Sequence, residues 1–184
     1  MLSCSSARLS PIGSTSRVST DYATAAGQIT LAQSVGRFAN AEYGGIVVIG
    51  MDTKRVPGGE IIRKICPVAI DGRTLQRCQR VIEHRLYPPP DMLRIESVPV
   101  QDGGLMLIDV PPQPEELKPF LVHGAVIDGR TETTFISVVR RRGESSIPMT
   151  PQMIHSTLAA GRALLRRGQL PHADPSTGSN NPPG

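Results

Sequence analysis

The segment that most constrains the fold runs from residue 38 to residue 52. It starts as a helical pattern, meets the pair Gly44 and Gly45, and continues as an apolar, β-branched run over residues 46–50. Paired glycines favour a turn, and an apolar run without alternation is typical of a strand buried on both faces. The segment therefore predicts a helix, a tight turn and a buried strand, with Asp52 just beyond the strand.

Apolar residues at helical spacing, together with capping residues, predict three helices. Thr20 or Asp21 is expected to cap the first helix, and Thr74 to open the second. Thr150 followed by Pro151 is a typical opening for the third. The helices are expected over residues 20–41, 74–86 and 151–167. The buried stripe of the second helix is expected to comprise Leu75, Cys78, Ile82 and Leu86. The apolar side of the third helix is expected to comprise Met153, Ile154, Leu158, Ala159 and Leu165.

Further strands are predicted by short apolar runs between turn residues. Residues 53–60 contain Lys54, Arg55, Pro57, Gly58 and Gly59 and are expected to form a turn. The expected strands cover residues 93–98, 105–110 and 134–140, with a hairpin turn at 102–104 and a proline-rich loop at 111–119. The order of elements predicts an α+β fold in which helices pack on a single mixed sheet.

Composition sets the limits of the folded part. Residues 1–19 are rich in Ser, Thr and Arg and are expected to be a disordered arm, residues 20–168 the domain, and residues 169–184 a disordered tail. No apolar run reaches the length of a membrane span, and no signal peptide is evident, so a cytoplasmic protein without a membrane partner is expected. Cys66 and Cys78 stand among apolar residues and are expected to be buried.

The charge balance is mildly basic, with a net charge of +4 and a sequence pI of about 9.3. This fits a polyanionic partner, although solubility alone would also explain it. The chain has three Phe, three Tyr and no Trp, which argues against a single-strand binder built on stacked aromatics. Phosphate-loop, serine-hydrolase and metal-ligand spacings are missing, so no cofactor or metal is expected.

Two groups of basic residues could contact phosphate. Arg140, Arg141 and Arg142 end a predicted strand and run into a turn that contains Ser145. Arginine forks suit phosphate, and alternation places the middle arginine on the opposite face from its neighbours. A charged edge strand in solvent is the alternative. The second group lies on the helix at 74–86, where a solvated face is the competing interpretation: Arg77, Arg80, His84 and Arg85.

Asp52 is a weak candidate for a catalytic role. It follows a buried strand, where a carboxylate can hold a divalent metal in a nuclease. One carboxylate does not make a metal site, and Asp21 is the only acid before residue 42. The simpler role for Asp52 is to form the turn at the exit of the strand.

Three segments resemble the Schlafen-type AlbA-like domain, a family found in bacterial and phage proteins and in Schlafen proteins. Each segment matches a motif of that family, in the family's order. The first is Phe38, Ala39 and Asn40, with Gly44, Gly45 and Gly50-Met51-Asp52; the second is Lys118-Pro119-Phe120; the third is Arg141-Arg142-Gly143-Glu144-Ser145-Ser146, with Ser146 in place of threonine.

The resemblance implies an α+β nucleic-acid-associated domain, and many members of the family are described as DNA-binding or transcriptional-regulator domains. Some Schlafen members are metal-dependent RNases with a carboxylate cluster. Their upstream acidic motif is missing here, and only Asp52 matches the remaining acidic position. The resemblance therefore implies a binding domain rather than an intact nuclease.

Three hypotheses follow. The first is a non-catalytic nucleic-acid-binding module, regulatory and expected to bind DNA, in which arginines contact phosphates. The second is a metal-dependent RNase or tRNase with Asp52 as a ligand. The third is a protein-interaction or regulatory subunit, with a homo-oligomer or a protein partner at an open sheet edge.

Overall fold

The computed structural model describes residues 23–56, 59–127, 129–142 and 145–166. Within them, α-helices and antiparallel sheets form an α+β fold, as the sequence predicted. The predicted arm at 1–19 and tail at 169–184 lie outside the described residues. None of the helices in these described parts is long and apolar enough to cross a membrane.

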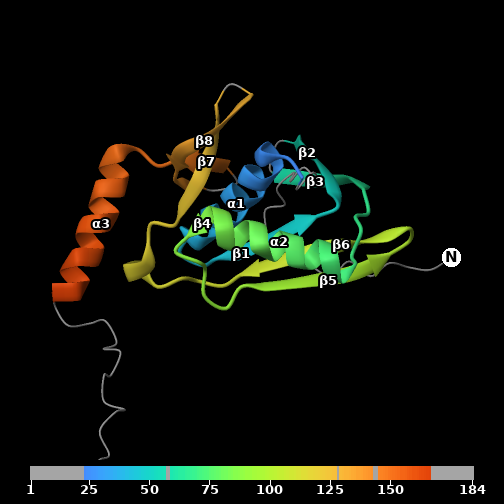
Figure 1. Ribbon diagram of the computed structural model, residues 1–184, viewed down its shortest axis with the longest axis horizontal. Coiled ribbons are helices and arrows are strands. Elements are labelled where there is room, and N and C mark those ends of the chain that lie inside the picture. Colours follow the sequence, from blue (N-terminus) through green and yellow to red (C-terminus); the bar gives the residue numbers. More distant parts are fainter. Residues whose placement is uncertain (1–22, 57–58, 128, 143–144, 167–184) are drawn as a thin grey trace, which may run out of the picture.

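The first helix, α1 (Ala25–Ala39), lies in the middle of the molecule (Figure 1). It begins later than predicted because the Thr24 hydroxyl accepts the Gly27 backbone N–H at 3.2 Å and caps the helix there. Thr20 and Asp21 are outside the described residues. Strands and a second helix pack around α1, so its residues are buried on most sides rather than on a single stripe.

The second helix, α2 (Gly72–Arg85), packs against α1 and confirms the helix predicted at 74–86. It starts earlier than predicted because the Asp71 carboxylate accepts the Thr74 backbone N–H at 2.7 Å. Within the predicted stripe, Cys78 and Ile82 are fully packed, and Leu75 lies half-buried at the edge of the core. Burial raises the pKa of the Cys78 thiol to about 12. Cys66 is exposed, contrary to the prediction.

A three-stranded antiparallel sheet has the order β1 (Gly45–Ile49), β6 (Gly103–Val110) and β5 (Arg94–Val100). The β5–β6 hairpin confirms the strands predicted on either side of residue 102. Strand β1 stands at the edge of this sheet, and Ile46 is 37% exposed while Val47 and Ile49 are buried. The prediction of a strand buried on both faces is wrong, because Ile46 is exposed and Val48 is only half-buried on the second face of β1.

Residues predicted as a turn at 53–60 instead contribute to a hairpin of β2 (Met51–Val56) and β3 (Gly59–Ile65). Pro57 and Gly58 favour a turn, but the residues on either side of them form strands, so the predicted turn was too long. A register shift between Asp52 and Thr53 marks a β-bulge in this pair.

The remaining strands form two more antiparallel sheets. One has the order β4 (Leu86–Tyr87), β7 (Leu121–Ile127) and β8 (Arg130–Ser137), and the other pairs β9 (Val139–Arg142) with β10 (Ser145–Pro148). The predicted strand at 134–140 is therefore divided between β8 and β9. The described strands do not form the single mixed sheet that was predicted, because they pair in separate antiparallel sheets and α1 packs against both three-stranded sheets.

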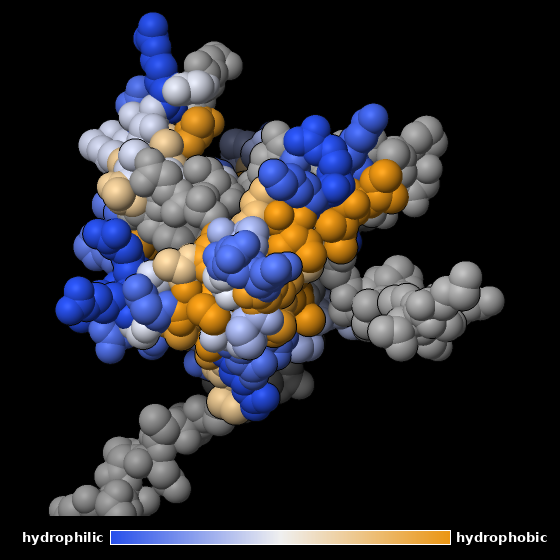
Figure 2. Space-filling model, turned by 90° about the vertical axis from the view of Figure 1, so that its right-hand side faces the viewer, coloured by the Kyte–Doolittle hydropathy of each residue, from blue (hydrophilic) through white to orange (hydrophobic). Residues whose placement is uncertain are grey.

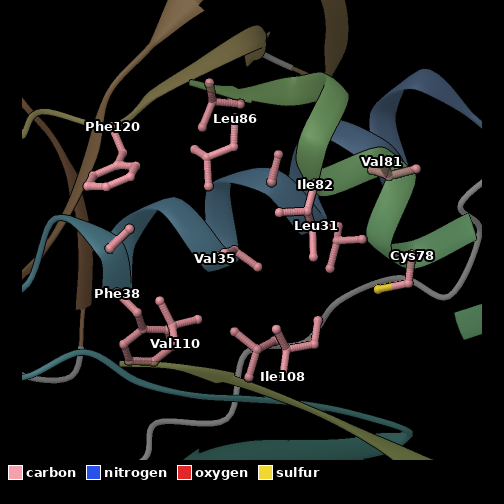
Figure 3. Packing of buried hydrophobic residues seen from close by; sticks show 14 of the residues in the cluster. Leu31, Val35, Phe38, Cys78, Val81, Ile82, Leu86, Ile108, Val110 and Phe120 are labelled. Carbon is pink, nitrogen blue, oxygen red and sulfur yellow. The ribbon is translucent and has the colours of Figure 1, made fainter. Parts of the chain in front are cut away.

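One apolar core joins these elements. Figure 3 shows side chains of α1 and α2 meeting those of β6 and of the segment before β7. Phe38 and Phe120, the largest of these side chains, are fully buried. The core holds α2 against α1 and so fixes the polar surface between the two helices.

The last helix, α3 (Pro151–Arg166), begins as predicted, with the Thr150 hydroxyl accepting the Met153 backbone N–H at 3.3 Å. It lies to one side of the molecule and packs on the short 3₁₀ helix η1 (Glu115–Leu117) (Figure 1). Leu158 is 45% exposed and Leu165 is 53% exposed. The predicted apolar side of this helix is therefore only partly covered, because η1 is too short to span it.

Candidate anion-binding groove

A hollow of about 560 Å³ lies along α2 near the start of α1. Arg73, Arg77, Arg80 and His84 line it from α2. These residues are separated by four, three and four positions, which places them on one stripe of the helix. The hollow is termed the α2 groove, and its other lining residues are Gln28, Thr74, Gln76, Val81 and Arg85.

Positive charge in the α2 groove has no acidic counterpart in its wall. The described lining residues include four arginines and one histidine, and none of them is an aspartate or a glutamate. Within the described part of the chain, Arg77 and Arg80 form no ion pair. Unpaired guanidinium groups on one stripe favour phosphate or carboxylate ligands.

Arg85 is held in the inner part of this groove. Its Nη2 donates to Gln28 Oε1 at 3.0 Å, and its Nη1 donates to the His123 carbonyl oxygen at 3.2 Å. Both acceptors are neutral, so they orient the guanidinium without neutralising its charge. The Arg85 side chain also ties α2 to α1 and β7.

The predicted strand-end arginines lie elsewhere. Arg140 lines a separate hollow of about 300 Å³ that also contains Glu42, Glu115 and Lys118, so acids and bases balance there. Gln28 and Asn40, which line the two hollows, are separated along α1 by about 18 Å. The structure therefore brings Arg77 and Arg80 together and does not bring Arg140 to them.

The other members of that arginine group have different surroundings. Arg141 lies on the Phe38 ring, with its guanidinium carbon 5.4 Å from the ring centroid. Arg37 lies at 4.7 Å from the same centroid. Arg142 pairs with Ser145 in the β9–β10 ladder, and both side chains lie outside what the structure describes.

Asn40 joins the first two segments that carry the family resemblance to each other and to the start of β9. Its Nδ2 donates to the carbonyl oxygens of Phe120 and Val139, both at 3.0 Å, and its Oδ1 accepts the Phe120 N–H at 2.7 Å. Lys118 Nζ donates to the Ala41 carbonyl oxygen at 2.9 Å and to Glu115 Oε1 at 2.6 Å. These bonds satisfy Asn40 and Lys118 internally, so they hold the end of α1 to β7 and β9.

Asp52 lies in an ion pair rather than in a cluster of carboxylates. Arg63 Nε donates to Asp52 Oδ2 at 2.8 Å, and a second guanidinium nitrogen of Arg63 contacts the same oxygen. Among the described residues, no three His, Cys, Asp or Glu side chains gather as metal ligands. The only feature of Asp52 that favours a metal role is therefore its place after strand β1, and its surroundings in the structure add no support.

Comparison with known proteins leaves the family open. No family model matches the chain, and no curated protein matches it. One solved structure, the DIP2311 protein from Corynebacterium diphtheriae, is 21% identical with a TM-score of 0.45. The match covers 67% of this chain and 18% of the DIP2311 chain, so this chain spans less than a fifth of it. A likeness at this level carries no argument about fold or function, and the resemblance to the Schlafen-type AlbA-like domain stays a prediction.

Sequence reasoning missed several lining residues of the groove, among them Arg73 and Gln28. Arg73 is one helical turn before Arg77, but a helix predicted to begin at Thr74 left it outside. The Asp71 cap was the signal that would have included Arg73. Gln28 had no local signal, because its place in the groove depends on how α1 packs against α2.

Proposed function

We propose that this protein is a nucleic-acid-binding module that holds backbone phosphates along the α2 groove. The observation that carries the proposal is the stripe of Arg73, Arg77 and Arg80 in a wall without acids. Phosphate contacts of this kind are independent of sequence and weaken as salt increases. The Schlafen-type resemblance supports the same class, and a cytoplasmic location is part of the proposal.

The length of the stripe suits a polynucleotide. From Arg73 to His84 the helix rises by about 16 Å, and one strand of B-form DNA carries a phosphate every ~3.4 Å of axis. The stripe is therefore long enough to contact more than one phosphate of a strand. Arg140 faces two carboxylates in its own hollow, so its contribution to phosphate binding is secondary in this proposal.

Binding to a labelled duplex and a labelled RNA, measured by fluorescence anisotropy at several salt concentrations, tests the proposal. Replacing Arg77 and Arg80 by Gln is expected to weaken binding and to reduce the slope of log K against log salt by about one per arginine. Arg140→Gln is the matched control and should change both quantities less. Absence of binding by the wild type at low salt would overturn the proposal.

A protein partner is the second candidate, and the β2–β3 hairpin favours it. Ile61, Ile62 and Ile65 are 52%, 58% and 48% exposed. Figure 2 shows hydrophobic surface between hydrophilic residues on the side of the molecule toward which β2 and β3 lie in Figure 1. Light scattering of the wild type and of Ile62→Lys tests whether copies of the chain associate through this hairpin. Self-association should decrease in the variant. A monomeric wild type would contradict self-association through this hairpin.

A further inference from the structure

The α2 groove has an exposed rim and a buried inner part. Arg73, Arg77, Arg80 and His84 are exposed and form the rim. Val81 is 7% exposed, and Gln28 and Arg85 are half-buried, so these three residues form the inner wall. A ligand can therefore lie along the rim or insert one end against the inner wall.

The inner wall contains a cation whose charge is not balanced. Arg85 bonds only neutral oxygens through its terminal nitrogens, and none of the ion pairs in the described residues involves it. Its Nε is enclosed and has no hydrogen-bond acceptor among the described residues. A partly buried guanidinium without a counter-charge is unfavourable, and an anion against the inner wall would relieve that penalty.

We propose that the inner wall binds the terminal phosphate monoester of a nucleic-acid strand, so that the protein prefers strand ends to strand interiors. This inference rests on the proposed function and assigns the rim to the phosphates that follow the terminal one. A monoester carries about −1.5 to −2 charge and three free oxygens at neutral pH. An internal diester carries a single charge and has only two free oxygens, so it would balance the charge of Arg85 less well.

The direct test compares oligonucleotides of one sequence that carry a 5′-phosphate, a 3′-phosphate or hydroxyl groups at both ends. One phosphorylated form is expected to bind about tenfold more tightly than the hydroxyl form, and the preferred end identifies the direction of the strand. Adenosine monophosphate is expected to compete with that form and to leave the weaker binding of the hydroxyl form unchanged. Equal binding of all three oligonucleotides would overturn the inference.

A variant that places a negative charge beside Arg85 within the protein itself tests the role of Arg85 directly. Gln28→Glu places a carboxylate at the acceptor position that Arg85 already contacts, so an ion pair should form there and the fold should be retained. The preference for the phosphorylated end is expected to disappear, while salt-dependent binding of the hydroxyl form persists at reduced strength. Gln152→Glu makes the same charge change on an exposed residue of α3 and should keep the end preference. Thermal unfolding of both variants verifies that they are folded.

The two proposals fail in different ways. Equal, salt-dependent binding of phosphorylated and unphosphorylated ends overturns the inference and leaves the proposed function intact. Absence of oligonucleotide binding overturns both, whether or not adenosine monophosphate binds. An end preference that survives Gln28→Glu overturns the assignment to Arg85 and the inner wall.

Discussion

Gly44 and Gly45 show how individual residues determine the packing of α1 against β1. At Gly44, φ is +66° and a Cβ would lie 2.1 Å from the Val110 carbonyl oxygen. At Gly45, a Cβ would lie 2.3 Å from Cδ1 of the buried Phe38 ring. The chain can pass between β6 and the end of α1 only because these two residues lack side chains.

Gly44→Ala is expected to lower the free energy of unfolding by more than about 2 kcal/mol, because the left-handed φ adds to a clash with backbone that cannot move aside. Gly72→Ala is the control, since nothing lies within 4 Å of that position at the start of α2. It should leave stability unchanged or raise it by up to about 1 kcal/mol. Denaturant unfolding measures both, and equal midpoints for the two variants would contradict the packing argument.

The helices illustrate how an element is fixed partly by its own sequence and partly by its neighbours. Local caps determine where α2 and α3 begin, at Asp71 and Thr150. Burial is decided by packing: α1 is surrounded and almost wholly buried, whereas Gly161 is the one buried residue described in α3. Periodicity alone predicted both helices and could not distinguish these two degrees of burial.

The Asp71 cap gives α2 a pH dependence. Hydrogen bonds from the Thr74 backbone N–H and hydroxyl, with Arg73 nearby, hold the pKa of Asp71 below its usual range. A lowered folded-state pKa means that this stabilisation is present at neutral pH and is lost as pH falls below the usual aspartate range. Asp71→Asn keeps a capping acceptor without the charge. The stability difference between wild type and variant should shrink on acidification, as measured by circular dichroism, and a difference independent of pH would contradict this role.

The exposed face of α3 predicts a small effect of polar substitution. Leu158→Gln should change the free energy of unfolding by less than about 0.5 kcal/mol, because the side chain is already 45% exposed. Leu31→Ala in α1 should lower it by about 2–5 kcal/mol, because Leu31 is fully buried. A large loss for Leu158→Gln that depends on protein concentration would mean that another copy covers this face, which light scattering would verify.

At the scale of the whole molecule, basic residues line two hollows that differ in their content of acidic side chains. The α2 groove collects arginines without acids, while the hollow around Arg140 balances two bases against two acids. Packing of α1 between these hollows keeps them apart, so they cannot act as one surface. Basic residues also lie on β2, β3 and β9, so what distinguishes the α2 groove is the absence of acids from its described lining residues.

Global stability should fall at alkaline pH through Cys78. Burial raises the pKa of this thiol to about 12, whereas an unfolded cysteine has a pKa of about 8.5. The folded chain keeps a proton that the unfolded chain releases, so stability is full below about pH 8.5 and decreases as pH rises toward the folded-state pKa. Cys78→Ala should be less stable at neutral pH but lose less stability between about pH 7 and about pH 10. Denaturant unfolding at both pH values measures this, and parallel losses in the two proteins would contradict it.

Local signals in the sequence determined the α+β class, the β5–β6 hairpin and the start of α3, while the start of α2 was predicted two residues too late. Caps, turn residues and apolar periodicity act over a few neighbouring residues and can be identified without the fold. They also placed Arg77 and Arg80 on one face of a helix. The β2–β3 hairpin was missed because its strands carry basic and glycine residues that resemble a turn.

Only the tertiary structure decided which basic residues lie together. Arg140 and Arg80 are equally basic in sequence, but α1 separates their hollows, and carboxylates surround only the first. Gln28 joins Arg85 because α1 crosses α2, a long-range contact for which neither residue carries a local signal. The sequence by itself determined the elements and their charges, and packing decided which charges share a surface.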